Sequence, residues 1–279
     1  MGFNCKLIYK VYFKYILYSQ TEGLAMTPQQ IELVKSTVPV LREHGVELTA
    51  YFYNRMLNNH PELKNVFNLD HQSTGQQPRA LAAAVLAYAE NIEQPEKLAK
   101  AVERIAVKHV SLDIQPDQYS IVGENLLHSI SEVLNVPFES DLIEAWKQAY
   151  LQLAAILTGV EAGKYDQLKQ ENGGWAGWRE FTITSIEEQN DGKLFKIAPV
   201  DQQAIIGFSE GEFISVKVHV PGKDIDQPQQ FNLLADSTAT EYAFLVKAEP
   251  NHSEYDVANI LLEHYKANDQ VAVSAPLKK

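Results

Sequence analysis

The sequence predicts two folded parts, an all-α domain followed by a small antiparallel β-domain. Over residues 26–172 the apolar residues recur every three to four positions, which is the period of amphipathic helices. From about residue 181 they alternate with polar residues in short runs bounded by turn signals, which is the period of β-strands. Three glycines within 173–177 mark the change of period. We therefore expect one domain over 26–172 and a second over 173–279.

The composition limits the classes of protein to which the chain can belong. Its 279 residues are enough for two ordinary domains and short for three. The net charge of −12 gives no electrostatic support to nucleic-acid binding. The single cysteine, Cys5, allows neither a disulfide framework nor a thiolate metal site, and it indicates a reducing, cytoplasmic setting.

Residues 1–25 differ from the rest and are treated as an N-terminal extension outside the working protein. Their aromatic and aliphatic residues are interrupted by lysines, so no run approaches the roughly 20 apolar residues that a membrane span needs. The same lysines make a poor signal peptide. An anchor lying in the membrane interface is the alternative interpretation, but we expect no membrane span.

The helical domain is predicted to begin at Thr27, where a capping side chain precedes a proline in the first turn. The apolar period then predicts a helix that kinks at Pro39 and ends at Gly45. The same period predicts further helical segments, with a polar loop over 70–78. These segments are a helix around Tyr53, a short turn over 61–66, a helix over 81–92, and helices that carry His109, Tyr119 and Trp146.

His109 lies on the apolar face of its helix, following Leu98, Val102 and Ile105 at helical spacing. A single histidine in this position is more often a satisfied core residue than a ligand. Tyr119 and Glu161, however, lie on the apolar faces of the next two helices, and buried polar groups need partners. A metal-bound histidine needs its second ring nitrogen held by a carboxylate or a similar group. The three residues together predict a haem-iron ligand and its outer shell.

Several segments of the helical part resemble the globin domain of bacterial flavohaemoglobins. The resemblance runs from about residue 26 to about residue 181. Single-domain bacterial haemoglobins share the pattern, so the helical part alone does not separate the two groups. The segments are Ala-Tyr-Phe-Tyr-Asn-Arg-Met at 50–56, His-Pro-Glu-Leu-Lys-Asn-Val-Phe at 60–67, Lys-His at 108–109, Gln-Tyr-Ser-Ile-Val-Gly-Glu at 118–124 and Ala-Trp at 145–146.

The resemblance implies a globin fold that binds haem b, with His109 as the proximal iron ligand and Lys108 beside it. Tyr119 and Glu161 match the outer shell of that ligand in the family. A carboxylate that accepts the Nδ1 proton makes the imidazole more electron-rich, which favours activation of oxygen over its storage.

On the opposite side of the haem, the resemblance implies that Tyr53 and Gln77 face the bound gas. A phenol and an amide can donate hydrogen bonds to a partially negative gas ligand and slow its release. Phe67 matches an aromatic residue that packs against the haem edge. Helix packing alone is the alternative interpretation of Phe67.

The second part is predicted to be an antiparallel β-barrel or sandwich with one helix over 257–265. By its order of elements it resembles the flavin-binding barrel of flavohaemoglobins, a domain of the ferredoxin-reductase type that binds flavin adenine dinucleotide (FAD). The predicted strands cover 181–185, 194–200, 213–220, 231–234, 242–247 and 270–274.

The residues that bind flavin in the family are altered here. In place of Arg-x-Tyr-Ser the chain has Gln229-Gln230-Phe231-Asn232, so the ring is kept as Phe231 but the phosphate-binding arginine is lost. Phe208 stands where a second aromatic residue is expected. The matching helix start has Asp256 and no glycine, and a carboxylate there repels phosphate. FAD is therefore the less favoured of the two cofactors.

The chain ends at Lys279, where the nicotinamide-binding domain of the family would begin, and it contains no Gly-x-Gly-x-x-Gly. The first hypothesis is a haem protein that binds oxygen and nitric oxide and converts nitric oxide to nitrate with an external reductase. The second is a non-enzymatic binding or sensing globin whose barrel docks a partner. The third is a truncated gene product, against which the altered flavin residues argue.

Overall fold

The computed structural model describes residues 23–250 and 252–278, which form two compact units. Most of the predicted extension, residues 1–22, lies outside the described residues. Of the described residues, the first unit includes 23–59, Gly75–Ala106 and Gln115–Ala162. The second includes His60–Thr74, Val107–Ile114 and the chain from Gly163 onward. Among the described helices, none is long and apolar enough to cross a membrane. The predicted division of the chain at residue 173 stays a prediction.

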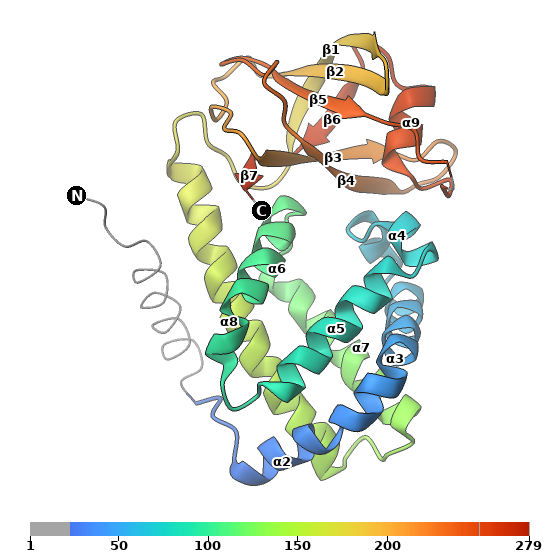
Figure 1. The fold of residues 1–279 in the computed structure, drawn as a ribbon, viewed down its shortest axis with the longest axis vertical. Coiled ribbons are helices and arrows are strands. Elements are labelled where there is room, and N and C mark those ends of the chain that lie inside the picture. The colour runs from blue at the N-terminus through green and yellow to red at the C-terminus, as the bar shows by residue number, and fades with distance from the viewer. Residues whose placement is uncertain (1–22, 251, 279) are drawn as a thin grey trace, which may run out of the picture. The chain divides into compact units, whose positions relative to one another are not determined.

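The first part of the chain is helical, as the sequence predicts (Figure 1). Helix α3 packs against both α5 and α7. Helix α6 passes from the first unit into the second after Ala106, and α8 does so after Ala162. The helices are α2 (Pro28–Ser36), α3 (Val38–Asn59), α4 (Leu69–Ser73), α5 (Gln76–Glu90), α6 (Ala99–Ser111), α7 (Pro116–Leu134) and α8 (Asp141–Gln170), with 3-10 turns η1 (Pro61–Asn65) and η2 (Pro95–Leu98).

The predicted start at Thr27 is confirmed, but the predicted end at Gly45 is wrong. Thr27 caps α2, because its side chain accepts a hydrogen bond from the Gln30 backbone N–H, and the Gln30 side chain accepts one from the Thr27 backbone N–H. The chain breaks at Thr37, and Pro39 lies in the first turn of α3 instead of kinking a longer helix. Gly45 lies buried inside α3, where a Cβ would make only an ordinary 3.6 Å contact with Ala82 on α5. The glycine therefore continues the helix and does not end it.

The predicted polar loop over 70–78 is also wrong in part. It contains the short helix α4, whose start is capped by the Asn68 side chain accepting from the His71 backbone at 2.8 Å. Gly75 then takes a left-handed conformation with φ of +73°, and α5 begins directly after it. Polar residues here cap short helices, which a reading of apolar periodicity does not detect.

The second part forms a seven-stranded antiparallel sheet with the strand order β4-β3-β6-β1-β2-β5, in which β7 pairs with β3. A bridge between Leu233 and Phe244 joins the end of β4 to β5, so the sheet closes as a barrel. Helix α9 packs against β3, β4 and β5 (Figure 1). The elements are β1 (Arg179–Gln189), β2 (Gly192–Pro199), β3 (Glu212–His219), β4 (Asp226–Asn232), β5 (Tyr242–Val246), α9 (Val257–His264), β6 (Gln270–Val273) and β7 (Leu277–Lys278).

The barrel is filled by aromatic and β-branched side chains. Tyr242, Phe181 and Phe244 are fully buried, and the rings of Phe181 and Tyr242 stack with their centroids 5.8 Å apart. The Tyr242 hydroxyl donates a 2.7 Å hydrogen bond to the carbonyl of Ile206, which satisfies the polar end of the ring.

Strand β4 begins five residues earlier than the predicted strand over 231–234, and β7 was not predicted. The first half of β4 contains Asp226, Gln227 and Pro228, residues that sequence patterns assign to turns. Gln227 is nevertheless fully buried, because residues 64–69 of the same unit lie against it and supply its hydrogen-bond partners. A contact between segments distant in sequence outweighs the local pattern here.

Candidate functional site

Tyr53 lies on α3 with 8% of its surface exposed, and its ring packs against Phe52 with centroids 4.9 Å apart. Burial raises the pKa of the Tyr53 phenol well above its usual range, because the charged phenolate loses its hydration. The phenol therefore stays protonated across physiological pH. It can act as a hydrogen-bond donor, as the predicted function requires.

Gln77 lies in the first turn of α5. Its Oε1 atom is buried, and within the described part of the chain no group forms a hydrogen bond to it. The next residue, Pro78, ties α5 to α3, because its carbonyl accepts a 2.7 Å hydrogen bond from the Thr49 hydroxyl. Rotation of the Gln77 amide by 180° would exchange its oxygen for its NH2 donor. Buried polar atoms are normally paired, so the unpaired oxygen of this amide is consistent with a polar ligand that binds next to the start of α5.

Tyr119 and Glu161 form a hydrogen bond in the first unit, as the sequence predicts. The Tyr119 hydroxyl donates to Oε1 of Glu161 at 2.6 Å, and Glu161 is only 3% exposed. The length is typical of a bond to a charged acceptor. The backbone carbonyl of Tyr119 in turn accepts from the Tyr150 hydroxyl at 2.5 Å. This network fixes the position of the Glu161 carboxylate on α8.

Gly123 is a residue of this network that sequence reasoning missed. A Cβ at this position would meet the ring of Tyr150, with Cδ1 at 2.8 Å, which is far inside van der Waals contact. Only glycine lets the Tyr150 ring cross α7 and reach the carbonyl of Tyr119. The signal was present, since Gly123 follows Tyr119 by one helical turn on the same face.

The remaining predicted haem residues, His109, Lys108 and Phe67, belong to the second unit. His109 is half-buried in the last turn of α6, and Lys108 beside it is exposed. Phe67 is half-buried and follows η1, where its backbone N–H donates to the carbonyl of Leu63 at 3.1 Å. The structure joins Tyr119 to Glu161, whereas a contact of either residue with His109 stays a prediction.

The start of α9 is the segment that the sequence predicts to match the phosphate-binding helix of flavin barrels, and two of its backbone amides are bound by side chains. Asp256 caps the helix by accepting from the Asn259 backbone at 2.8 Å, and it is buried. The Gln229 side chain from β4 accepts from the Ala258 backbone at 3.3 Å. Two N–H groups of the first turn are therefore bound by side-chain oxygens of the barrel itself. This arrangement does not fit the pyrophosphate of a flavin dinucleotide.

The aromatic residues predicted to stack on a flavin are part of the barrel core. Phe231 is 6% exposed, and its ring centroid lies 5.0 Å from that of Phe244. Phe208 is half-buried and packs against the same core. Phe231 thus packs within the barrel core, and little of its ring is exposed to a flavin.

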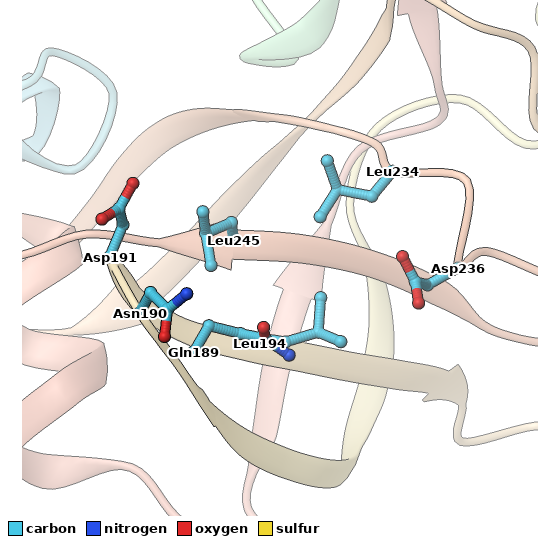
Figure 2. Close-up of a pocket in the computed structure, with 7 residues that line it drawn as sticks. All are labelled: Gln189, Asn190, Asp191, Leu194, Leu234, Asp236 and Leu245. Carbon is cyan, nitrogen blue, oxygen red and sulfur yellow. The ribbon is translucent and has the colours of Figure 1, made fainter.

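A hollow of about 330 Å³ lies on the barrel, with a floor of three leucines, Leu194, Leu234 and Leu245 (Figure 2). Gln189 and Asn190 also line it, and Figure 2 shows the carboxylates of Asp191 and Asp236 at its two ends. No residue of the predicted haem or flavin sites contributes to its wall.

Comparison with known proteins relates most of the chain to one group of proteins. Residues 50–157 match the family model described as Globin. A flavohemoprotein of Rhizobium meliloti is 41% identical over 90% of this chain, and one of Chromobacterium violaceum is 43% identical over 90%. The chain spans 63% of the length of each of these relatives. The crystal structure of a flavohemoglobin from Malassezia yamatoensis with bound FAD and heme matches 91% of this chain, and this chain covers 65% of it, with a TM-score of 0.80 and 26% identity.

Proposed function

Because the chain is a homologue of the flavohemoproteins and contains a globin domain, we propose that it binds haem b and converts nitric oxide to nitrate. When bound, haem supplies the iron at which diatomic gases bind and react. His109 would hold the iron, with Lys108 beside it in the sequence, and Phe67 would pack against the haem edge. The observation that carries the proposal is the buried, unpaired amide oxygen of Gln77 on α5. Helix α3, which packs against α5, carries the buried phenol of Tyr53.

Tyr53 and Gln77 hold dioxygen in place for its reaction with nitric oxide. The phenol of Tyr53 stays protonated and donates a hydrogen bond to the oxygen atom that gains negative charge. The amide of Gln77 can present its NH2 group to the same ligand. These contacts slow the loss of dioxygen, so that nitric oxide meets it within the site.

Glu161 acts on the proximal side. The 2.6 Å hydrogen bond from Tyr119 holds its carboxylate in one position on α8. In this proposal the carboxylate accepts the Nδ1 proton of the ligand imidazole, which would make the imidazole a stronger electron donor. Tyr150 supports this through the backbone of Tyr119.

The reaction needs one electron from outside the site. Nitric oxide, dioxygen and one electron combine to give one nitrate ion. The occupied amides of α9 favour an external reductase as the source of that electron over a flavin held in the barrel. The single cysteine supports a cytoplasmic setting, where such reductases are available.

The test is a single-turnover reaction of the haem-loaded chain. Oxygenated protein is mixed with an equal amount of nitric oxide, and nitrate is measured together with the conversion of the haem to the ferric state. The proposal requires one nitrate for each ferric haem formed. Release of dioxygen with no nitrate would contradict it.

A binding or sensing globin is the second candidate, and it is favoured by the barrel, whose flavin-binding positions are used internally. Repeated addition of nitric oxide in the presence of a generic reductase separates the two. An enzyme continues to form nitrate, whereas a sensor gives one ferric-forming event and then no further product.

A further inference from the structure

Strand β4 forms side-chain hydrogen bonds to two helical segments of the same unit, residues 64–69 and the last turn of α6. In a barrel of this kind the polar residues of one strand would be expected to face solvent or a cofactor. Here they bind protein. These bonds give the barrel a structural role toward the helical segments of its unit that does not involve a flavin.

The first contact involves Gln227, which is fully buried. Its Nε2 donates to the carbonyl of Lys64 at 2.6 Å, and its Oε1 accepts from the backbone of Leu69 at 2.7 Å. Asn68 donates a further 2.9 Å bond to the carbonyl of Pro228. The bond from Asn68 also satisfies a backbone carbonyl of β4. Together these bonds hold the segment that carries Phe67.

The second contact involves Gln230 and the end of α6. Nε2 of Gln230 donates to the hydroxyl of Ser111 at 2.9 Å, and Ser111 is fully buried. The same hydroxyl donates to the carbonyl of Lys108 at 2.8 Å. The Ser111 oxygen therefore accepts from β4 and donates into the last turn of α6, the turn that contains His109.

The last turn of a helix has carbonyls without intrahelical partners, so it frays unless other groups bind them. In α6 the carbonyl of Lys108 is bound by Ser111, and Val110 is buried against Leu168 and Ile206 of the same unit. Both residues that follow His109 are thus fixed, one by apolar packing and one by the hydrogen bond from Gln230. Loss of that bond would leave the Ser111 hydroxyl held only by its bond to the Lys108 carbonyl within α6, so the turn would lose its hydrogen bond to the barrel.

We propose that Gln230 is a positioning residue for His109, acting through Ser111, and that the barrel thereby sets the orientation of the iron ligand. The inference rests on the proposed function, in which His109 holds haem iron. It assigns the barrel a part in haem chemistry that needs no flavin.

The experiment uses the full chain loaded with haem and the variants Gln230→Leu and Ser111→Ala. The readouts are the iron–histidine stretching band of the ferrous protein and the midpoint potential of the haem. Either variant should shift and broaden the band and move the potential in one common direction. The double variant should move both readouts no further than the larger single change, because both substitutions break the same hydrogen bond between Gln230 and Ser111.

Gln229→Leu is the matched control, since Gln229 is the adjacent residue of β4 and its amide oxygen bonds to the α9 backbone instead. It should leave band and potential as in the unaltered chain. If Gln230→Leu and Ser111→Ala bind haem fully and leave both readouts unchanged, the inference is overturned while the proposed function stands. If the unaltered chain binds no haem, or its band does not arise from histidine, both fail.

Discussion

The helical site and the start of α9 are both lined with polar side chains, but they differ in how those side chains are satisfied. At α9, Gln229 and Asp256 bind the amides of the first turn. On α5, the amide oxygen of Gln77 is buried with no partner in the described chain. The comparison teaches that polar groups alone do not mark a cofactor site. The two places differ in whether the buried polar group finds a partner within the described part of the chain.

The first prediction removes the donor from the helical site. Tyr53→Phe deletes one hydroxyl and preserves the ring that packs on Phe52. A hydrogen bond to a charged acceptor is worth about 1.5–3 kcal/mol, so dioxygen should dissociate about 10 to 100 times faster. Stopped-flow measurement of dioxygen release checks this. An unchanged rate would mean that Tyr53 does not face the gas.

The second prediction tests the packing that supports Glu161. Gly123→Ala places a methyl group against the Tyr150 ring and should destabilise the protein by about 1–3 kcal/mol, as overpacking does. Urea unfolding measures the change. Gly207→Ala is the control, because an added Cβ there has no heavy atom of the described chain within 4 Å. Equal stability of the two variants would contradict the account of Gly123.

The third prediction restores a phosphate-binding side chain near the start of α9. Gln229→Arg with Asp256→Ser supplies a phosphate ligand, removes a carboxylate and keeps a capping side chain, so FAD affinity should rise about tenfold or more. Quenching of FAD fluorescence measures it. Gln203→Arg with Asp236→Ser makes the same change of charge on exposed residues and should have little effect. If both pairs respond equally, net charge and not the α9 amides controls binding.

The smallest expected effect is the contribution of His71, on α4, to the pH dependence of the free energy of unfolding. Burial and the nearby positive charge of Lys108 lower the pKa of His71 below 6.5, partly opposed by Asp70 and Asp256. As the pH falls below 6.5 the unfolded chain takes up the proton first, so the free energy of unfolding decreases toward acid pH and its full value is kept above 6.5. His71→Gln should make unfolding less dependent on pH between 5 and 7 in urea titrations. An unchanged dependence would show that His71 is not the group responsible.

The sequence predicted the elements whose apolar period is strong, and it failed where a distant contact decides the structure. The helices that carry His109, Tyr119 and Trp146 follow from local spacing alone. The polar start of β4 could not be predicted, because the partners of Gln227 lie some 160 residues away in the chain.

The same limit applies to the site residues. The hydrogen bond between Tyr119 and Glu161 was predicted from the cost of burying polar groups. The need for glycine at position 123 was not, because it depends on the path that the Tyr150 ring takes across α7. Periodicity places a residue on a face of a helix, but it does not give the shape of what packs there.

The most direct test of the central comparison is the cofactor content of the purified full chain. Haem and flavin are each quantified from absorption spectra taken before and after heat release of bound cofactors. The account predicts a strong Soret band with about one haem per chain and no stoichiometric flavin. Stoichiometric flavin would contradict the interpretation of α9, and a chain that takes up no haem even after addition of haemin would contradict the helical site.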